Sequence, residues 1–258
     1  MFKSSAVVVC LCLAVATATP LPKTQEPEGL IAGGIDAEEG QFPYQVSLRT
    51  TSNNAHFCGG SVLNNRWIIT AGSCAQGKEP AGVSVMAGSK SLTRGGSIHA
   101  VDRIIVHPNF DVNTLTNDVA VMRVRNPFML SPDIMAVQMS SEFVSIAYGA
   151  LLSGWGRRTM DNPNFPDWLQ YVPVNIITNT ECRVRFEAPY DQRITDNTIC
   201  TSAAFGRGAC LGDAGGPVLH GGELQGVVSW GIPCGLGYPD VHARVSVHRP
   251  WVLVHTMV

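Results

Sequence analysis

This 258-residue chain has almost no net charge, because 18 Lys and Arg side chains nearly balance 20 Asp and Glu side chains. Without an excess of positive charge it has no global field to attract nucleic acid or an anionic membrane surface. It also lacks internal repeats and the Cys-x-x-Cys or paired-His spacing of structural metal sites. We therefore expect no nucleic-acid partner, no membrane partner, no cofactor and no metal, and we interpret His107, His220 and His248 as loop or surface residues.

Long hydrophobic runs are also absent, apart from a short one at the N-terminus. Lys3 precedes an apolar run from Ala6 to Val15, which ends at the small residues Ala16-Thr17-Ala18. This pattern is typical of a secretory signal peptide. A run of this length is too short for a transmembrane helix, which needs about 20 residues, so a membrane anchor is disfavoured. We predict a signal peptide at 1–18 and a secreted, extracellular protein.

Residues 19–30 are rich in proline and charge and have little to bury. Such a composition predicts a short extended leader or propeptide. Of the eight cysteines, Cys10 and Cys12 leave with the signal peptide, and six remain. An even number of cysteines in an oxidising compartment predicts three disulfides, for which the count alone allows fifteen connectivities.

Helical periodicity is scarce in the remainder of the chain. Short strand-like runs recur instead, separated by Gly, Pro and Asn, and together they predict an all-β domain of closed sheets or a sandwich. Only the tail, about 247–257, has the apolar stripe of a helix. The predicted strands are 42–48, 61–63, 67–70, 83–86, 99–106, 119–124, 150–152, 169–174, 218–219 and 224–229.

Seven short motifs occur in an order that resembles the chymotrypsin-like (S1) serine proteases, from Ile31 to the end of the chain. They are Ile31-Ala32-Gly33-Gly34, Cys58-Gly59-Gly60-Ser61, Thr70-Ala71-Gly72-Ser73-Cys74, Asn117-Asp118-Val119-Ala120, Gly154-Trp155-Gly156, Gly212-Asp213-Ala214-Gly215-Gly216-Pro217 and Ser229-Trp230-Gly231.

The resemblance implies a trypsin-like fold for 31–258. This fold has two six-stranded antiparallel Greek-key β-barrels, here roughly 31–135 and 136–246, with a cleft between them and a C-terminal helix, 247–258. The resemblance also implies the disulfide pairs Cys58–Cys74, Cys182–Cys200 and Cys210–Cys234.

The chemistry of that family needs a serine nucleophile, a histidine base and a buried aspartate that orients the histidine. Asp118 occupies the aspartate position, but Ser73 stands at the histidine position and Ala214 at the serine position. Alanine has no nucleophilic atom, so no neighbour can activate it. We therefore expect no peptidase activity. The backbone amides of Gly212 and Ala214 are expected to remain as an oxyanion-hole remnant, because they do not depend on a side chain.

In active relatives a newly cut N-terminus pairs with an aspartate beside the nucleophile, and here the resemblance assigns these roles to Ile31 and Asp213. Leu30 precedes Ile31, so processing by a trypsin-like enzyme is not expected. Ser47 and His56 match the residues that hold this aspartate before cleavage. The hypothesis that follows is a persistent precursor-like state in which His56 binds Asp213.

Four residues match the specificity pocket of the family. Gly208 lies at the floor, Gly231 at the entrance and Asp240 on the wall, with His242 two residues further on. A glycine floor with an aspartate on the wall resembles broad-specificity arthropod chymotrypsin- and collagenase-like members. Two interpretations of Asp240 and His242 stay open: a buried ion pair, or a solvated rim.

These observations predict a secreted, monomeric and non-catalytic homologue, a pseudoprotease. Its partner would be an extracellular protein, either a protease, a protease substrate or an inhibitor. The homologue would act as decoy, antagonist or cofactor in a protease cascade of immunity, complement or haemostasis. One alternative is a weakly active or altered chymotrypsin/elastase-like endopeptidase, and another is a degenerating gene product without a selected role.

Overall fold

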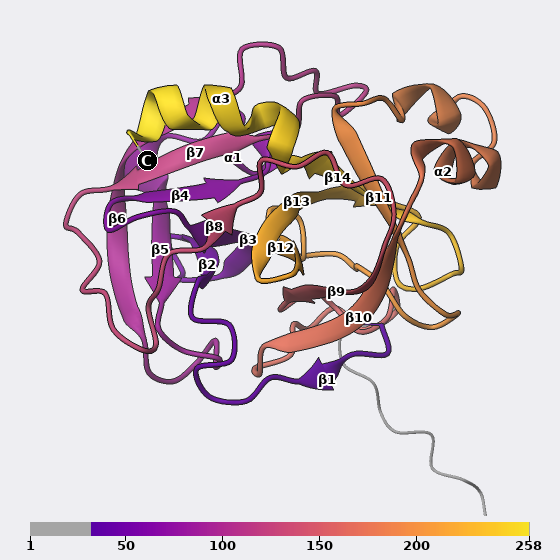
Figure 1. Ribbon diagram of the computed structural model, residues 1–258. Coiled ribbons are helices and arrows are strands. Elements are labelled where there is room, and N and C mark those ends of the chain that lie inside the picture. The colour runs from indigo at the N-terminus through magenta and orange to yellow at the C-terminus, as the bar shows by residue number, and fades with distance from the viewer. Residues whose placement is uncertain (1–31, 258) are drawn as a thin grey trace, which may run out of the picture.

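A computed structural model describes residues 32–257, so the predicted signal peptide, the leader and Ile31 lie outside the described part of the chain. Two closed antiparallel barrels of six strands each lie side by side, the first in violet and magenta and the second in orange and yellow (Figure 1). The predicted trypsin-like fold is confirmed. No helix within residues 32–257 is long and apolar enough to cross a membrane.

The first barrel closes in the order β2-β3-β4-β7-β6-β5. Its strands are short and rich in β-branched residues, and their inward side chains, such as Val46, Ile68 and Val121, are completely buried. The strands are β2 (Gln45–Thr50), β3 (His56–Val62), β4 (Trp67–Thr70), β5 (Val83–Ala87), β6 (Ser97–Val106) and β7 (Ala120–Val124), with α1 (Gly72–Ala75) and the 3-10 turn η1 (Pro80–Gly82) between β4 and β5.

The second barrel closes because β9 pairs with both β10 and β12. Two further short strands add to it: β1 pairs with β10, and β8 lies parallel to β13. The strands are β1 (Ile35–Asp36), β8 (Gln138–Met139), β9 (Ala147–Gly154), β10 (Gln170–Ile177), β11 (Thr198–Ser202), β12 (Pro217–His220), β13 (Glu223–Gly231) and β14 (Asp240–Arg244).

The start of the described chain lies on the second barrel and not on the first, to which 31–135 was assigned. Ile35 pairs with Tyr171 of β10, and Ala32 forms an antiparallel bridge with Gly208. The Gly208 amide donates to the Ala32 carbonyl at 3.1 Å. The N-terminal segment therefore crosses to the barrel that carries Ala214 and lies against the predicted pocket floor.

Two helices belong to the second half of the chain, and one of them was not predicted. This is α2 (Asn179–Arg185), which is followed by the 3-10 turn η2 (Tyr190–Arg193). Seven residues are too few to show a helical stripe, but Thr178 caps the helix by accepting from the Glu181 amide at 3.1 Å. The spacing Thr-x-x-Glu is a recognisable helix start, so the sequence does contain a local signal for α2.

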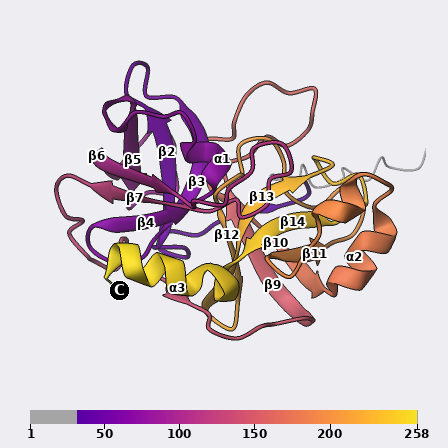
Figure 2. The ribbon, with the colours of Figure 1, turned by 90° about the horizontal axis from the view of Figure 1, so that it is seen from above.

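The C-terminal helix α3 (Val245–Thr256) begins two residues before its predicted start. Although it follows the second barrel, it runs along the first barrel, beside β7 and β4 (Figures 1 and 2). His248 faces inward and is only 3% exposed, so the prediction of a surface histidine was wrong. Its Nδ1 lies 2.7 Å from the Arg244 carbonyl, as expected for a ring that packs back onto its own helix.

The three disulfides join the cysteines that the resemblance paired: Cys58 with Cys74, Cys182 with Cys200, and Cys210 with Cys234. The first holds α1 to β3, the second holds α2 to β11, and the third ties the loop of Ala214 to the loop after β13. Two of the three bonds therefore restrain segments that carry predicted site residues.

Candidate functional site

Ser73, Asp118 and Ala214 come from three different elements at the junction of the barrels. Ser73 lies in α1, Asp118 lies just before β7, and Ala214 lies in the loop that leads into β12. The Ala214 carbonyl accepts from the Gly59 amide of β3 at 2.8 Å, which fixes this loop of the second barrel against the first.

Asp118 is the hydrogen-bond acceptor of the site and is 1% exposed. Its Oδ1 accepts from the Ser73 amide at 2.6 Å. Its Oδ2 accepts from the hydroxyls of Ser73 at 3.1 Å and Ser229 at 2.5 Å. Burial raises the pKa of this carboxyl, and the hydrogen bonds from Ser229 and Ser73 oppose that rise. Asp118 is thus satisfied by serine donors, with no imidazole among them.

Ser229 was missed as a site residue, although it opens the Ser229-Trp230-Gly231 motif. It lies on β13, far from Asp118 in the chain, and only the closing of the second barrel against the first brings its hydroxyl to Asp118. The motif alone could have directed attention to this residue.

Neither Ala214 nor Ser73 is placed as an activated nucleophile. Ala214 is half-buried and ends at its methyl group, while Ser73 is exposed and donates its hydroxyl proton to Asp118. A serine hydroxyl becomes nucleophilic only when a positioned base removes its proton. The structure therefore places Ser73 as a hydrogen-bond partner of Asp118.

The loop around Ala214 keeps a sharply bent backbone. Gly212 has a φ of +101° and Gly215 a φ of +81°, both in the region that favours glycine. A Cβ at Gly212 would lie 2.5 Å from Cε1 of Phe165, and a Cβ at Gly215 would collide with Thr70 and the Gly59 carbonyl. The loop therefore keeps a shape that only these glycines allow, even though it carries no nucleophile.

The predicted contact between His56 and Asp213 is not present, and this part of the precursor hypothesis was wrong. His56 binds the Ser47 hydroxyl at 2.8 Å and the Gly212 carbonyl at 3.1 Å. Phe165 packs edge-on against the His56 ring, with the ring centroids 5.0 Å apart. The ring thus supports the backbone of the loop and does not reach the carboxylate. Burial lowers the pKa of His56 to about 4, so the ring is neutral at physiological pH.

Asp213 is completely buried and is bound by backbone amides. Its Oδ1 accepts from Gly156 at 2.7 Å and its Oδ2 from Cys210 at 2.9 Å. Burial raises its pKa to about 7, and the two amides oppose that rise. The predicted pairing with Ile31 lies outside the described residues.

A pocket of about 170 Å³ opens beside Ala214, and the predicted pocket residues Gly231 and Asp240 line it. The other two predicted pocket residues, Gly208 and His242, do not line it. Gly208 lies against Asp240, since a Cβ there would lie 2.7 Å from Oδ2 of Asp240. The other lining residues are Ala209, Cys210, Leu211, Gly212, Ala214, Val228, Ser229, Trp230 and Pro233.

Asp240 and His242 do not form an ion pair, and neither lies on a solvated rim. Oδ2 of Asp240 accepts from the Ala209 amide at 2.8 Å, whereas Nε2 of His242 lies 2.8 Å from the Thr201 hydroxyl. Burial raises the pKa of Asp240 to about 7, an effect that Asp213 reinforces, and burial lowers the pKa of His242 to about 3. The pocket therefore holds one carboxyl with an elevated pKa and no counter-charge from His242.

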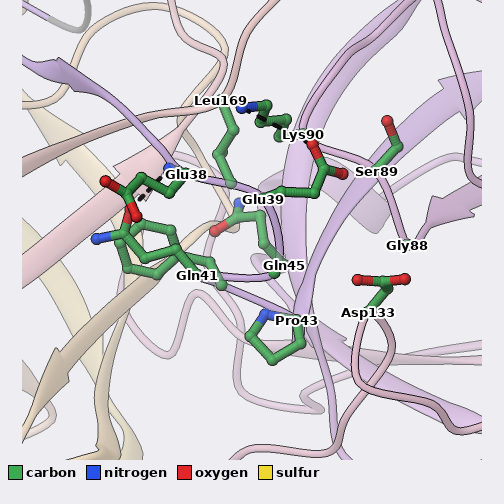
Figure 3. A pocket seen from close by; sticks show the side chains of 12 residues that line it. Glu38, Glu39, Gln41, Pro43, Gln45, Gly88, Ser89, Lys90, Asp133 and Leu169 are labelled. Carbon is green, nitrogen blue, oxygen red and sulfur yellow. Dashed lines mark hydrogen bonds and ion pairs between the residues drawn. The ribbon is translucent and has the colours of Figure 1, made fainter.

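A second, much smaller cavity of about 20 Å³ lies among Glu38, Glu39, Asp133 and Lys90, with Gln45 on one wall (Figure 3). Lys90 and Glu39 form an ion pair across it at 3.7 Å. Within residues 32–257 no three Asp, Glu, His or Cys side chains gather closely enough to hold a metal ion. This cavity has room for about one water molecule and shares no residue with the pocket beside Ala214.

Comparison with known proteins agrees with the observed fold. A family model described as trypsin matches residues 31–252. Trypsin alpha of Drosophila melanogaster is 36% identical over 249 residues, which cover 96% of this chain and 94% of the fly protein. Trypsin delta of the same species is 34% identical, with 96% of each chain covered. Chymotrypsin-2 of Vespa crabro is 35% identical over 223 residues, which are 86% of this chain and 98% of the wasp protein.

Proposed function

Because the chain belongs to the trypsin family of serine proteases, we propose that it keeps the family scaffold for binding and has lost peptide-bond cleavage. The protein is secreted and holds a segment of an extracellular protein in the cleft between its barrels. In this way it acts as a decoy, antagonist or cofactor for a related protease. The partner is a protease substrate, a protease or an inhibitor.

The observation that carries this proposal is the closed arrangement around Asp118. Its oxygens accept from Ser73 and Ser229, and Ala214 supplies no oxygen opposite them. Loss of the serine or the histidine of a triad alone costs on the order of 10⁶ in kcat. At about 1.4 kcal/mol per decade this is roughly 8 kcal/mol of barrier. The backbone donors that remain can contribute only about 10³–10⁴ over water.

Binding, by contrast, needs none of the lost atoms. The pocket beside Ala214 is open, the glycines of the loop keep its shape, and Cys210–Cys234 restrains its rim. A site with these parts can accept a side chain from a partner without reacting with it. Trypsin alpha and chymotrypsin-2 are named as proteases, and this chain is similar to both over most of its length. It has Ser73 and Ala214 at the positions where the family resemblance places the histidine and the serine.

Activity assays on four proteins test the loss of catalysis: the native chain, Ser73→His, Ala214→Ser and the double variant. We expect no hydrolysis of peptide esters or amides, and no labelling by a serine-reactive fluorophosphonate, for the native chain. The double variant should gain activity by several decades, because histidine and serine must act together. Hydrolysis by the native chain that a fluorophosphonate abolishes would contradict the proposal and favour a weakly active endopeptidase.

A pocket-filling variant tests binding. A Cβ at Gly231 points at Asp240, 3.0 Å from its Oδ1, so the side chain of Gly231→Phe enters the pocket. We expect this variant to lose at least about tenfold in affinity for protein inhibitors that insert a loop into trypsin-like clefts, since one blocked anchor removes more than 1.4 kcal/mol. Gly82→Phe is the control, because a Cβ at Gly82 meets nothing within 4 Å. Equal affinities for both variants would place binding elsewhere.

A further inference from the structure

Four arginines gather on the outer face of the first barrel. Arg66 precedes β4, Arg103 lies on β6, Arg123 lies on β7, and Arg125 follows β7 directly. Arg103 and Arg123 are directly opposite each other across the β6–β7 ladder. Directly opposed residues of an antiparallel pair share one face of the sheet, so these two side chains leave the barrel on the same side. The strands β4, β6 and β7 lie at the left of Figure 1. None of the four arginines lines the pocket beside Ala214.

Within residues 32–257, Asp102 is the one carboxylate that lies within 4.0 Å of any of these four guanidinium groups. Asp102 binds Arg123 through two contacts, 2.8 Å from Nε to Oδ1 and 3.3 Å from Nη2 to Oδ2. The hydrogen bond from Arg123 is the main cause of the lowered pKa of Asp102, and the charges of Arg66 and Arg125 lower it further. Four guanidinium groups against one carboxylate leave about three positive charges uncompensated. Like charges directly opposite each other destabilise a sheet, so stability does not explain this arrangement.

The cluster is also partly held in position. Nη2 of Arg66 donates to the Arg125 carbonyl at 2.6 Å, and its Nε is buried without an acceptor among the described residues. Arg123 is fixed by Asp102, while Arg103 and Arg125 are exposed. The guanidinium groups of Arg66 and Arg123 are therefore held in position. Beside them, Arg103 and Arg125 are exposed and accessible to an anion.

We propose that this face, Arg66-Arg103-Arg123-Arg125, binds a sulfated polysaccharide. The planar fork of arginine matches the oxygens of a sulfate and forms strong charge-assisted hydrogen bonds with them. A protein partner would need an apolar anchor at the centre of the interface. The aromatic ring here, Trp67, is 7% exposed and lies beneath Arg123, with 5.9 Å from the guanidinium to the ring centroid. A sulfated polysaccharide carries dense negative charge and needs no such anchor.

The test measures binding of the whole protein to heparin, as a probe, in about 0.15 M salt, where weak surface attraction is screened. The double variant Arg103→Ala/Arg125→Ala leaves the Arg123–Asp102 pair intact. The control Arg183→Ala/Arg185→Ala removes the same charge from the exposed side of α2, on the other barrel. Losing charge-assisted hydrogen bonds should weaken heparin binding about tenfold or more in the first variant, against less than about twofold in the control.

Three results would overturn the proposal. One is a native protein that does not bind heparin at this salt concentration, and another is an equal loss in both variants. The third is that polyglutamate or phosphatidylserine vesicles bind the same arginines as tightly as heparin does, which would assign the face to an acidic protein or a membrane surface. Thermal unfolding of both variants confirms that each is folded. The result of the heparin test does not depend on whether the cleft between the barrels binds a protein.

Discussion

At the scale of single residues, the side chain at position 73 suits the buried carboxylate beside it. Ser73 is short enough to donate to Asp118 from both its amide and its hydroxyl. Oδ2 of Asp118 also accepts from the Ser229 hydroxyl, so the Ser73 hydroxyl adds a second donor to an oxygen that already has one. Ser73 therefore contributes to the hydrogen bonding of this buried carboxylate through its amide and its hydroxyl.

Asp240 is the residue whose charge state should shape the pH dependence of stability. Burial raises its pKa to about 7, and the charge of Asp213 contributes to that rise. The unfolded chain loses this proton near pH 4, so between about pH 4 and 7 the folded state holds a proton that the unfolded state lacks. The contribution of Asp240 to stability is therefore present below about pH 4 and is lost as the pH rises to 7.

Asp240→Asn should remove that dependence, because an amide accepts from the Ala209 amide as well as a carboxyl does. The free energy of unfolding of the variant, minus that of the native chain, should increase as the pH rises from 4 to 8. The total increase should be no more than about 4 kcal/mol. Urea unfolding at a series of pH values measures the difference, and Asp133→Asn, which removes an exposed carboxyl, is the control. A gain that is equal in both variants, or no gain, would show that burial does not raise this pKa.

At the scale of elements, short segments depend on local caps and cross-links more than on periodicity. Helix α2 has seven residues and a single buried one, Cys182, which is bonded to Cys200 of β11. Isolated helices of this length are unstable in water. Its stability therefore comes from the disulfide and from the Thr178 cap.

Thr178→Ala should destabilise the protein by about 1 kcal/mol, because the Glu181 amide loses its acceptor. Thr178→Ser keeps the hydroxyl and should cost much less. Equilibrium denaturation of the two variants separates loss of the cap from loss of the methyl group. The role of the cap would be refuted by equal destabilisation in both.

At the scale of the whole molecule, α3 joins the two barrels. Val245 and Val252 of this helix belong to one apolar cluster with Val62, Ile68 and other buried residues of the first barrel. The same cluster includes Leu224 and Val227 of the second barrel. Since this core is continuous, we expect the barrels to unfold together.

Val252→Ala should therefore lower the stability of the whole molecule by about 2 kcal/mol, or roughly 4–8 °C in Tm, within one calorimetric transition. Val252 is completely buried, whereas Val254 on the same helix is 77% exposed. Val254→Ala should leave Tm nearly unchanged. Two separate transitions in the Val252→Ala variant would show that the barrels are independent units.

The sequence by itself, through seven ordered motifs that resemble the chymotrypsin-like serine proteases, implied the family, the two-barrel fold and the three disulfide pairs. The motifs depend on residue identity and order along the chain, which the sequence reports directly. The short α2 and the position of β1 on the second barrel were not predicted, because a seven-residue helix and a two-residue strand carry almost no periodic signal.

Only the tertiary structure decided which partner each buried polar group has. Ser229 reaches Asp118, His56 binds the Gly212 carbonyl and not Asp213, and Asp240 and His242 have separate partners. The opposition of Arg103 and Arg123 is likewise a matter of strand register. The physical reason is common to all of them: hydrogen bonds and charge pairs act over a few ångströms, and barrel closure sets those distances between segments far apart in the chain.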